Sequence, residues 1–166
     1  MELTDLLPLE QWTQIENEIH EHSGLESNVF NTDGIRITDN KVWVNRLCPA
    51  IKATDKGQSF ICAVAHMNLA NQAKDEKRPV IEACDAGLMK IVVPIFVDGN
   101  YIGAVGACAL LPAGGEVDAF LVNKMTDIDE ANIEALCEDL AVIEKNSAEE
   151  VAQFIWEKIE AVVSEG

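Results

Sequence analysis

The sequence predicts an α+β fold in which an antiparallel sheet is flanked by an N-terminal and a C-terminal helix. Amphipathic, helix-like segments begin and end the chain, whereas its middle holds apolar, β-branched segments joined by short turns. Two turns contain Asp-Gly, at Asp33-Gly34 and Asp98-Gly99, and this pair supplies the positive φ angles of a tight hairpin. Strands joined by tight hairpins pair antiparallel, unlike the alternating strand–helix units of a parallel sheet.

The length and composition indicate one domain. The chain has 166 residues, of which 48% are hydrophobic and only 5% aromatic, so we expect a single domain over residues 1–166 with a largely aliphatic core. Its central part should span about residues 8–145, and residues 146–166 should add a C-terminal helix.

We expect the first long helix from Pro8 to His22. Its apolar side chains recur at helical spacing, and the polar residues between them, including Glu16, should cover the opposite, solvated face. Proline suits a first helical turn, and Gly24 suits a C-terminal cap. The expected inner stripe consists of Leu9, Trp12, Ile15 and Ile19.

A hairpin and a helical connector should follow this helix. The hairpin pairs a strand from Leu25 to Asn31 with one from Ile35 to Thr38, and residues 41–47 fit either a strand or the start of a helix. Polar residues indicate a surface connector from Cys48 to Ser59, whose last residue can cap a helix from Phe60 to Lys77. The expected inner stripe of that helix is Ile61, Val64, Ala65, Leu69 and Ala73.

Three strands should form the centre of the sheet, over Val80–Cys84, Leu88–Val97 and Tyr101–Leu111. The first two are joined by the turn Asp85-Ala86-Gly87, and the last two by the second Asp-Gly turn. The middle strand is mostly apolar, as expected of a central strand that is covered on both faces. Two glycines in the third strand, Gly103 and Gly106, leave space for a close-packed helix or for a ligand.

Further helices are expected after the sheet. A short one should cover Val117–Lys124, a second Ile128–Ile143 with Asp127 as its N-cap, and a last one Ala148–Val163 with Ser147 as its N-cap. The last helix should either dock on the sheet or pair with a second copy, and we expect a homodimer. Its apolar stripe is Val151, Phe154, Ile155, Ile159 and Val162.

The charge balance excludes several classes of partner. The net charge is −17, from 12 basic and 29 acidic residues, so the chain repels nucleic-acid phosphates and anionic membrane surfaces. No apolar run approaches the roughly 20 residues that span a bilayer, and the start, MELTDLLPLE, lacks the basic region of a signal peptide. We therefore expect a cytoplasmic protein that binds neither nucleic acid nor membrane.

The cysteines allow three interpretations. There are five of them, an odd number, and the expected cytoplasmic location argues against a disulfide framework. Most free cysteines are small buried hydrophobic residues, but some contact an organic ligand. The third interpretation is a zinc or iron–sulfur site, although no CxxC pair is present. Its ligands would be Cys48, Cys62 and Cys84, with Cys108 or His66 as the fourth.

Four other residues are candidates for a ligand site. His66 follows Cys62 by four residues, so both could share a helix face, although a half-exposed polar histidine is the simpler interpretation. Asp85 could bind a ligand hydroxyl but suits a turn better, and Gly87 suits the backbone of that turn. Trp43 could form a pocket wall. No nucleophile elbow, HExxH motif or convincing triad is present, so we expect no enzyme.

The order of cysteines, glycines and prolines resembles the PocR-type sensory domain, a bacterial and archaeal ligand-binding module of the PAS/GAF-like superfamily. The matching residues are Cys48, Cys62, Arg78-Pro79-Val80, Cys84, Gly87-Leu88, Pro94-Ile95 and Asp98-Gly99. The resemblance implies a PAS/GAF-like domain that senses small organic compounds and passes the signal to attached output domains. This chain ends soon after the sensory core, so it should signal through a partner or act as a stand-alone binder.

Two functional hypotheses follow. In the first, a small organic molecule binds between the sheet and the connector from Cys48 to Lys77, and its binding shifts a helix arrangement that a partner reads. In the second, the protein is a redox sensor whose metal or iron–sulfur cluster is held by the cysteines named above. One difference from the family weakens the second hypothesis. The family often has further cysteines near the position of Cys62, whereas this chain has Val64, Ala65 and His66 there.

Overall fold

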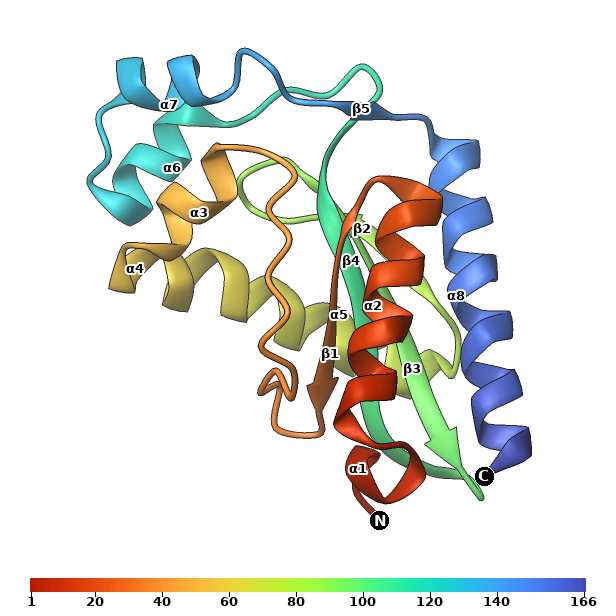
Figure 1. The fold of residues 1–166 in the computed structure, drawn as a ribbon. Coiled ribbons are helices and arrows are strands. Elements are labelled where there is room, and N and C mark those ends of the chain that lie inside the picture. The colour runs from red at the N-terminus through yellow and green to blue at the C-terminus, as the bar shows by residue number, and fades with distance from the viewer.

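The computed structural model describes all residues from 1 to 166 and contains an antiparallel sheet with helices on both faces (Figure 1). Four strands lie side by side in the order β1 (Glu26–Asn31), β4 (Asn100–Pro112), β3 (Met89–Val97) and β2 (Val80–Ala83). Each pairs antiparallel with its neighbour, and the short β5 (Val142–Ile143) adds to the end of β4 in parallel. The predicted α+β class is confirmed.

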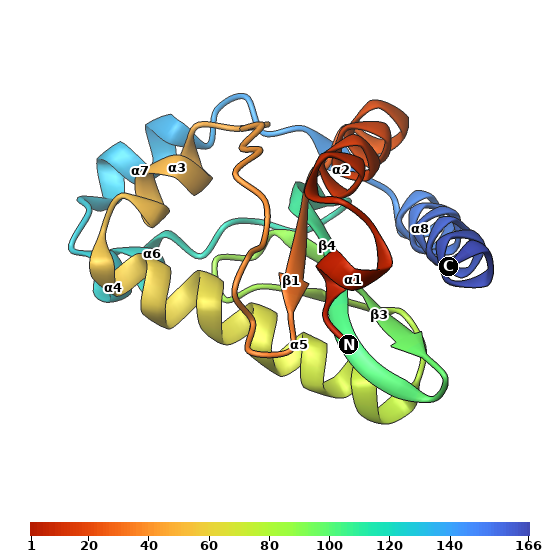
Figure 2. The same ribbon diagram turned by 60° about the horizontal axis from the view of Figure 1, so that its bottom comes forward.

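The helices divide between the two faces of the sheet (Figure 2). The first face carries α1 (Leu3–Leu6), α2 (Leu9–Ser23) and α8 (Lys145–Glu165). The second face carries α5 (Ala63–Glu76) and, beyond it, the short helices α3 (Leu47–Lys52), α4 (Asp55–Gly57), α6 (Ala119–Thr126) and α7 (Glu130–Leu136). The π-helix η1 (Gln58–Cys62) joins α4 to α5. No helix combines the length and apolar character needed to cross a bilayer.

The main core fills the space between the first face of the sheet and the helices α2 and α8. Alternate strand residues, including Val29, Val93 and Val105, point into it and meet fully buried side chains of the two helices. The Trp12 indole is wholly buried and donates a hydrogen bond to the Leu3 carbonyl over 2.9 Å, which fixes α1 against α2. Gly24 caps α2 in the left-handed conformation, as predicted.

Glu16 was predicted to face solvent, and that prediction is wrong. Its side chain is only 1% exposed, because its carboxylate accepts hydrogen bonds from the Val29 amide over 2.9 Å and from the Arg36 guanidinium over 3.2 Å. Thr38 and Asn40 donate to the same carboxylate. This network replaces the second strand predicted for Ile35–Thr38, of which only a single bridge between Phe30 and Arg36 forms.

The second face of the sheet has two smaller clusters of apolar residues. One lies under α5, where Leu69, Ala70 and Ala73 pack on Val92 and Ala104. The other lies farther along and joins the short helices to the β2–β3 turn through Leu47, Ile51, Ile61, Ala86, Leu88, Val122 and Ile133. The apolar packing is therefore interrupted between the two clusters.

The helix predicted from Phe60 to Lys77 begins differently. Ser59 is no cap, because α4 leads directly into η1, in which the Ala63 amide donates to the Gln58 carbonyl, five residues back. A π-turn holds one residue more than an α-turn and rotates the following side chains by about 100°. Val64 is therefore 40% exposed instead of buried, and His66, expected to be half-exposed, is only 3% exposed.

The predicted boundaries after the sheet also need correction. Asp127 does not cap the next helix but ends α6 in the left-handed conformation, and α7 runs only from Glu130 to Leu136. Residues 142–143 pair with β4 at Leu111 and Pro112, so they form a strand instead of the end of a helix. The last helix starts at Lys145, before the predicted Ser147 cap.

Candidate functional site

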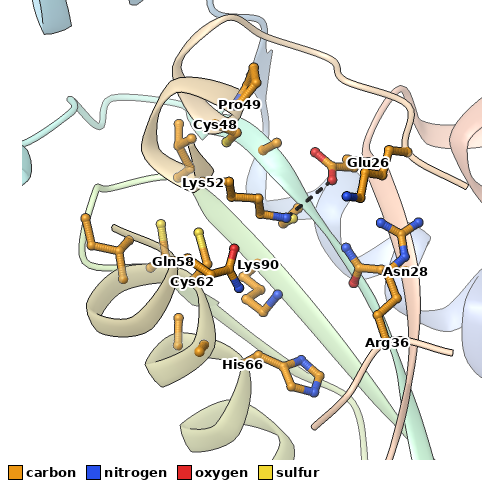
Figure 3. Close-up of a pocket in the computed structure, with 18 of the residues that line it drawn as sticks. Glu26, Asn28, Arg36, Cys48, Pro49, Lys52, Gln58, Cys62, His66 and Lys90 are labelled. Carbon is orange, nitrogen blue, oxygen red and sulfur yellow. Dashed lines mark ion pairs between the residues drawn. The ribbon is translucent and has the colours of Figure 1, made fainter. Parts of the chain in front are cut away.

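A pocket of about 540 Å³ opens between the second face of the sheet and the helical layer of α3, η1 and α5 (Figure 3). It occupies the place where the two apolar clusters of this face are interrupted. The sheet contributes Glu26, Asn28, Phe30, Lys90 and Cys108, the helical layer Cys48, Lys52, Gln58, Cys62 and His66, and the segment after β1 Arg36, Lys41 and Trp43.

Strand register brings the polar residues of the sheet wall together. Glu26 on β1 lies opposite Cys108 on β4, and Cys108 lies opposite Lys90 on β3, so the three side chains form one row on the same face. Two residues along β1, Asn28 lies opposite Gly106. A side chain at position 106 would collide with the Asn28 amide oxygen, so this glycine makes room for Asn28.

The helical wall depends on the π-helix. Gln58 and Cys62 lie at the two ends of η1 and both line the pocket. One turn later, the His66 ring packs against Phe30 of the opposite wall, with 3.6 Å between the ring centroids. Single π-turns inside α-helices are frequent at functional sites, and here the π-turn aims His66 at the sheet.

The charges of the pocket do not balance. Its lining has four cationic side chains and one carboxylate, in a protein of net charge −17. The carboxylate, Glu26, pairs with the Lys52 ammonium across 3.7 Å, and Arg36 pairs with the buried Glu16 across 3.2 Å. Lys41 is exposed to solvent. Lys90 is only 7% exposed, and its ammonium forms neither a hydrogen bond nor an ion pair with the protein.

Several buried polar atoms of the pocket lack a hydrogen-bond partner. They are Glu26 Oε1, Asn28 Oδ1 and both ring nitrogens of His66. Buried polar groups in proteins are nearly always hydrogen-bonded, and exceptions call for an explanation. All four atoms belong to residues that line this one pocket.

Burial sets the protonation states of the site. It lowers the pKa of His66 to about 3, and the neighbouring Lys90 ammonium acts in the same direction, so the imidazole is neutral at pH 7. Burial raises the pKa of the Cys62 thiol to about 11 and also raises the pKa values of Cys48 and Cys108. These thiols are therefore protonated at neutral pH.

The structure brings most of the predicted site residues to this pocket. Cys48, Cys62, Cys84, Cys108, His66 and Trp43 all line it. However, no group of three or more His, Cys, Asp or Glu side chains lies close enough to hold a metal ion. The zinc or iron–sulfur site thus remains a prediction that the observed placement of the thiols does not fit.

Two predicted site residues lie outside the pocket. Asp85 and Gly87 form the turn between β2 and β3, and Asp85 is exposed to solvent. Gly87 has a φ of 99°, and a side chain there would collide with the Glu116 carbonyl, so the backbone conformation explains this glycine. Cys137 packs in the cluster of the short helices and does not line the pocket.

Sequence reasoning missed the charged and amide side chains of the pocket. The clearest signal was Lys90, a single charge within the apolar run from Leu88 to Val93. A charged residue in a central strand seldom faces an apolar core. Glu26 and Asn28 gave a weaker signal because they stand in a short strand that could have been exposed on one face.

The architecture defines a small α+β domain with an apolar core on one face of its sheet and a pocket of mixed polar and apolar lining on the other. This arrangement is compatible with the PAS/GAF-like class. Comparison with protein families identifies the domain more specifically: the family described as the sensory domain found in PocR matches residues 5–166. The chain belongs to this family, as its sequence pattern predicted. No curated protein and no solved structure matches it.

Proposed function

We propose that this protein senses a small organic molecule by binding it in the pocket between the sheet and the layer of α3, η1 and α5. The observation that carries this proposal is the set of buried, unpartnered polar atoms around one cavity. Its volume of about 540 Å³ falls in the range of ligand sites, roughly 300–1,000 Å³, and apolar and polar groups are mixed in its lining as they are in such sites. Family membership independently supports a sensory role, which we propose to be non-catalytic.

The helical layer is the element suited to transmit binding. A ligand that contacts Gln58, Cys62 and His66 acts directly on the π-helix η1 and on the first turn of α5. Ile61, on the same turn, packs against α6 and α7 through Val122 and Ile133. Binding that favours one arrangement of η1 would thus shift the surface of these outer helices, which a partner protein could read.

The remaining parts of the proposal concern the setting in which the protein works. Five free cysteines support a cytoplasmic location, because thiols stay reduced there. Helix α8 supports a homodimer, because Phe154 and Trp156 remain partly exposed beside its buried stripe. Sedimentation equilibrium at micromolar concentration tests the dimer, and a monomer at all concentrations would contradict it.

A thermal-shift screen with short alcohols, diols and carboxylates tests ligand binding. A ligand of the native state at 100 times its Kd adds about 2.7 kcal/mol to the free energy of unfolding. For a domain of this size that corresponds to a rise in Tm of roughly 5–11 °C. We expect Cys62→Phe, which fills the pocket, to abolish the shift.

Met67→Phe is the matched control for that variant. Met67 lies on the same helix but does not line the pocket, so this variant should respond like the unmodified protein. Absence of a shift with every compound would contradict the proposed function. Equal shifts in both variants would contradict the proposed location of the site.

A further inference from the structure

The Lys90 ammonium bears on the charge of the proposed ligand. Lys90 stands in the middle of β3, and its side chain extends into the space bounded by Gln58, Asn28 and His66 (Figure 3). Its nearest aromatic contact is Phe30, with Nζ 5.8 Å from the ring centroid. The Lys90 residue is only 7% exposed, and no oxygen of the protein accepts a hydrogen bond from its ammonium, whose nitrogen keeps some accessible surface in the pocket. An ammonium in such a place favours an anion or a comparable set of acceptors.

No carboxylate of the protein forms an ion pair with the Lys90 ammonium. Glu26, in the same cross-strand row, is two strand spacings away, about 10 Å, and is engaged by Lys52. Glu82 is the direct neighbour of Lys90 on β2, but it lines a separate surface groove and forms no ion pair. Arg36 and Lys52 are each paired with one carboxylate and Lys41 is exposed at the rim, so Lys90 is the cation of the pocket interior that has no counter-charge.

The neighbours of Lys90 indicate which other groups the ligand carries. Asn28 Oδ1 is an unpartnered acceptor and therefore requires a donor such as a hydroxyl. Neutral His66 offers one donor and one acceptor, neither of which has a partner in the protein. The other end of the pocket is lined by Ile61, Leu88 and Trp43, which suit an apolar substituent.

We propose that the ligand is a hydroxycarboxylate whose carboxylate pairs with Lys90 and whose hydroxyl group binds Asn28 and His66. A single uncompensated cation matches the single charge of a carboxylate better than the double charge of a phosphate monoester. The apolar end of the pocket accommodates an aliphatic or aromatic side group. This inference rests on the proposed function, because it names the class of compound that the same pocket binds.

Matched pairs of compounds test the inference on the unmodified protein. Mandelate is compared with 1-phenyl-1,2-ethanediol, and glycerate with glycerol, since each pair differs in the carboxylate alone. Calorimetric titration at pH 7.5 should show at least about tenfold tighter binding of the carboxylate in the pair that binds, because hydrogen bonds to charged groups are the stronger ones. Phenyl phosphate serves as the doubly charged probe and should bind more weakly than mandelate.

Variants at two lysines locate the charge. Lys90→Met should weaken carboxylate binding by about 10- to 100-fold and leave diol binding nearly unchanged, whereas Lys90→Arg should retain part of the preference. Lys41→Met removes an exposed cation from the rim of the same pocket and is the matched control. It should alter affinity by less than about twofold, since exposed charge pairs contribute little.

The outcomes separate this inference from the proposed function. Equal binding of a carboxylate and its diol by the unmodified protein would overturn the hydroxycarboxylate and leave the sensory pocket in place. Tighter binding of phenyl phosphate than of mandelate would also overturn it. No binding by any compound, charged or neutral, would instead contradict the proposed function.

Discussion

Acidification below pH 6.5 should destabilise the protein through His66. Burial and the Lys90 ammonium hold the pKa of this imidazole at about 3, whereas a histidine in the unfolded chain titrates near 6.5. Between these two values the unfolded state binds a proton that the folded state does not. The stability contributed by neutral His66 is therefore complete above pH 6.5 and is lost as the pH falls toward 3.

The size of the effect follows from the two pKa values. At pH 5 the unfolded imidazole is almost fully protonated and the folded one almost fully neutral, which costs about 2 kcal/mol of the free energy of unfolding relative to pH 7.5. At pH 4 the cost is about 3 kcal/mol. For a domain of this size, 2 kcal/mol corresponds to a lowering of Tm by roughly 4–8 °C.

Urea unfolding of the unmodified protein and of His66→Gln, each at pH 7.5 and pH 5, measures this contribution. All other titrating groups are common to both proteins, so the difference between their pH dependences isolates His66. We expect the unmodified protein to lose about 2 kcal/mol more than the variant. The same loss in both proteins would refute the argument and show that the imidazole reaches solvent in the folded state.

Three further predictions concern other parts of the fold. Gly106→Ala should displace the Asn28 amide and weaken ligand binding more than about tenfold. Urea unfolding should show that the fold remains intact, and an unchanged affinity would contradict the prediction. Glu16→Gln breaks the buried pair with Arg36 and should cost about 3–5 kcal/mol in urea unfolding, and a cost below 1 kcal/mol would show that the network contributes little. The raised pKa of Cys62 should slow its alkylation by iodoacetamide at pH 7.5 about 100-fold relative to an ordinary thiol. Mass spectrometry of the digested protein measures this rate, and a rate like that of an ordinary thiol would contradict the prediction.

Local sequence signals predicted the strands β2, β3 and β4 well, because short turns of characteristic sequence join them. Asp98-Gly99 requires two positive φ angles, observed at 50° and 81°, and this fixes the hairpin between β3 and β4. The helix α2 was equally predictable, since its periodic apolar stripe is followed by Gly24 in the left-handed conformation.

Predictions failed where distant residues decide the local structure. Helical periodicity assumes a uniform turn, so the π-turn at Gln58–Cys62 moved Val64 outward and His66 inward against expectation. The burial of Glu16 depends on Arg36, twenty residues later, and no local pattern signals that pairing. Four cysteines were predicted to gather, and Cys48, Cys62, Cys84 and Cys108 do line one pocket. Their distances from one another, which no sequence pattern gives, are too long for a metal-binding group of three.

The two faces of the sheet differ in the continuity of their apolar packing. On the first face, 20 buried apolar residues form one continuous core between the sheet and the helices α2 and α8. On the second face, Glu26, Asn28 and Lys90 stand where apolar residues could join the two separate clusters. Polar residues at such positions lower stability, and natural proteins accept that loss mainly where activity requires it. The ligand that we propose accounts for Glu26, Asn28 and Lys90 at these positions, where folding alone would favour apolar residues.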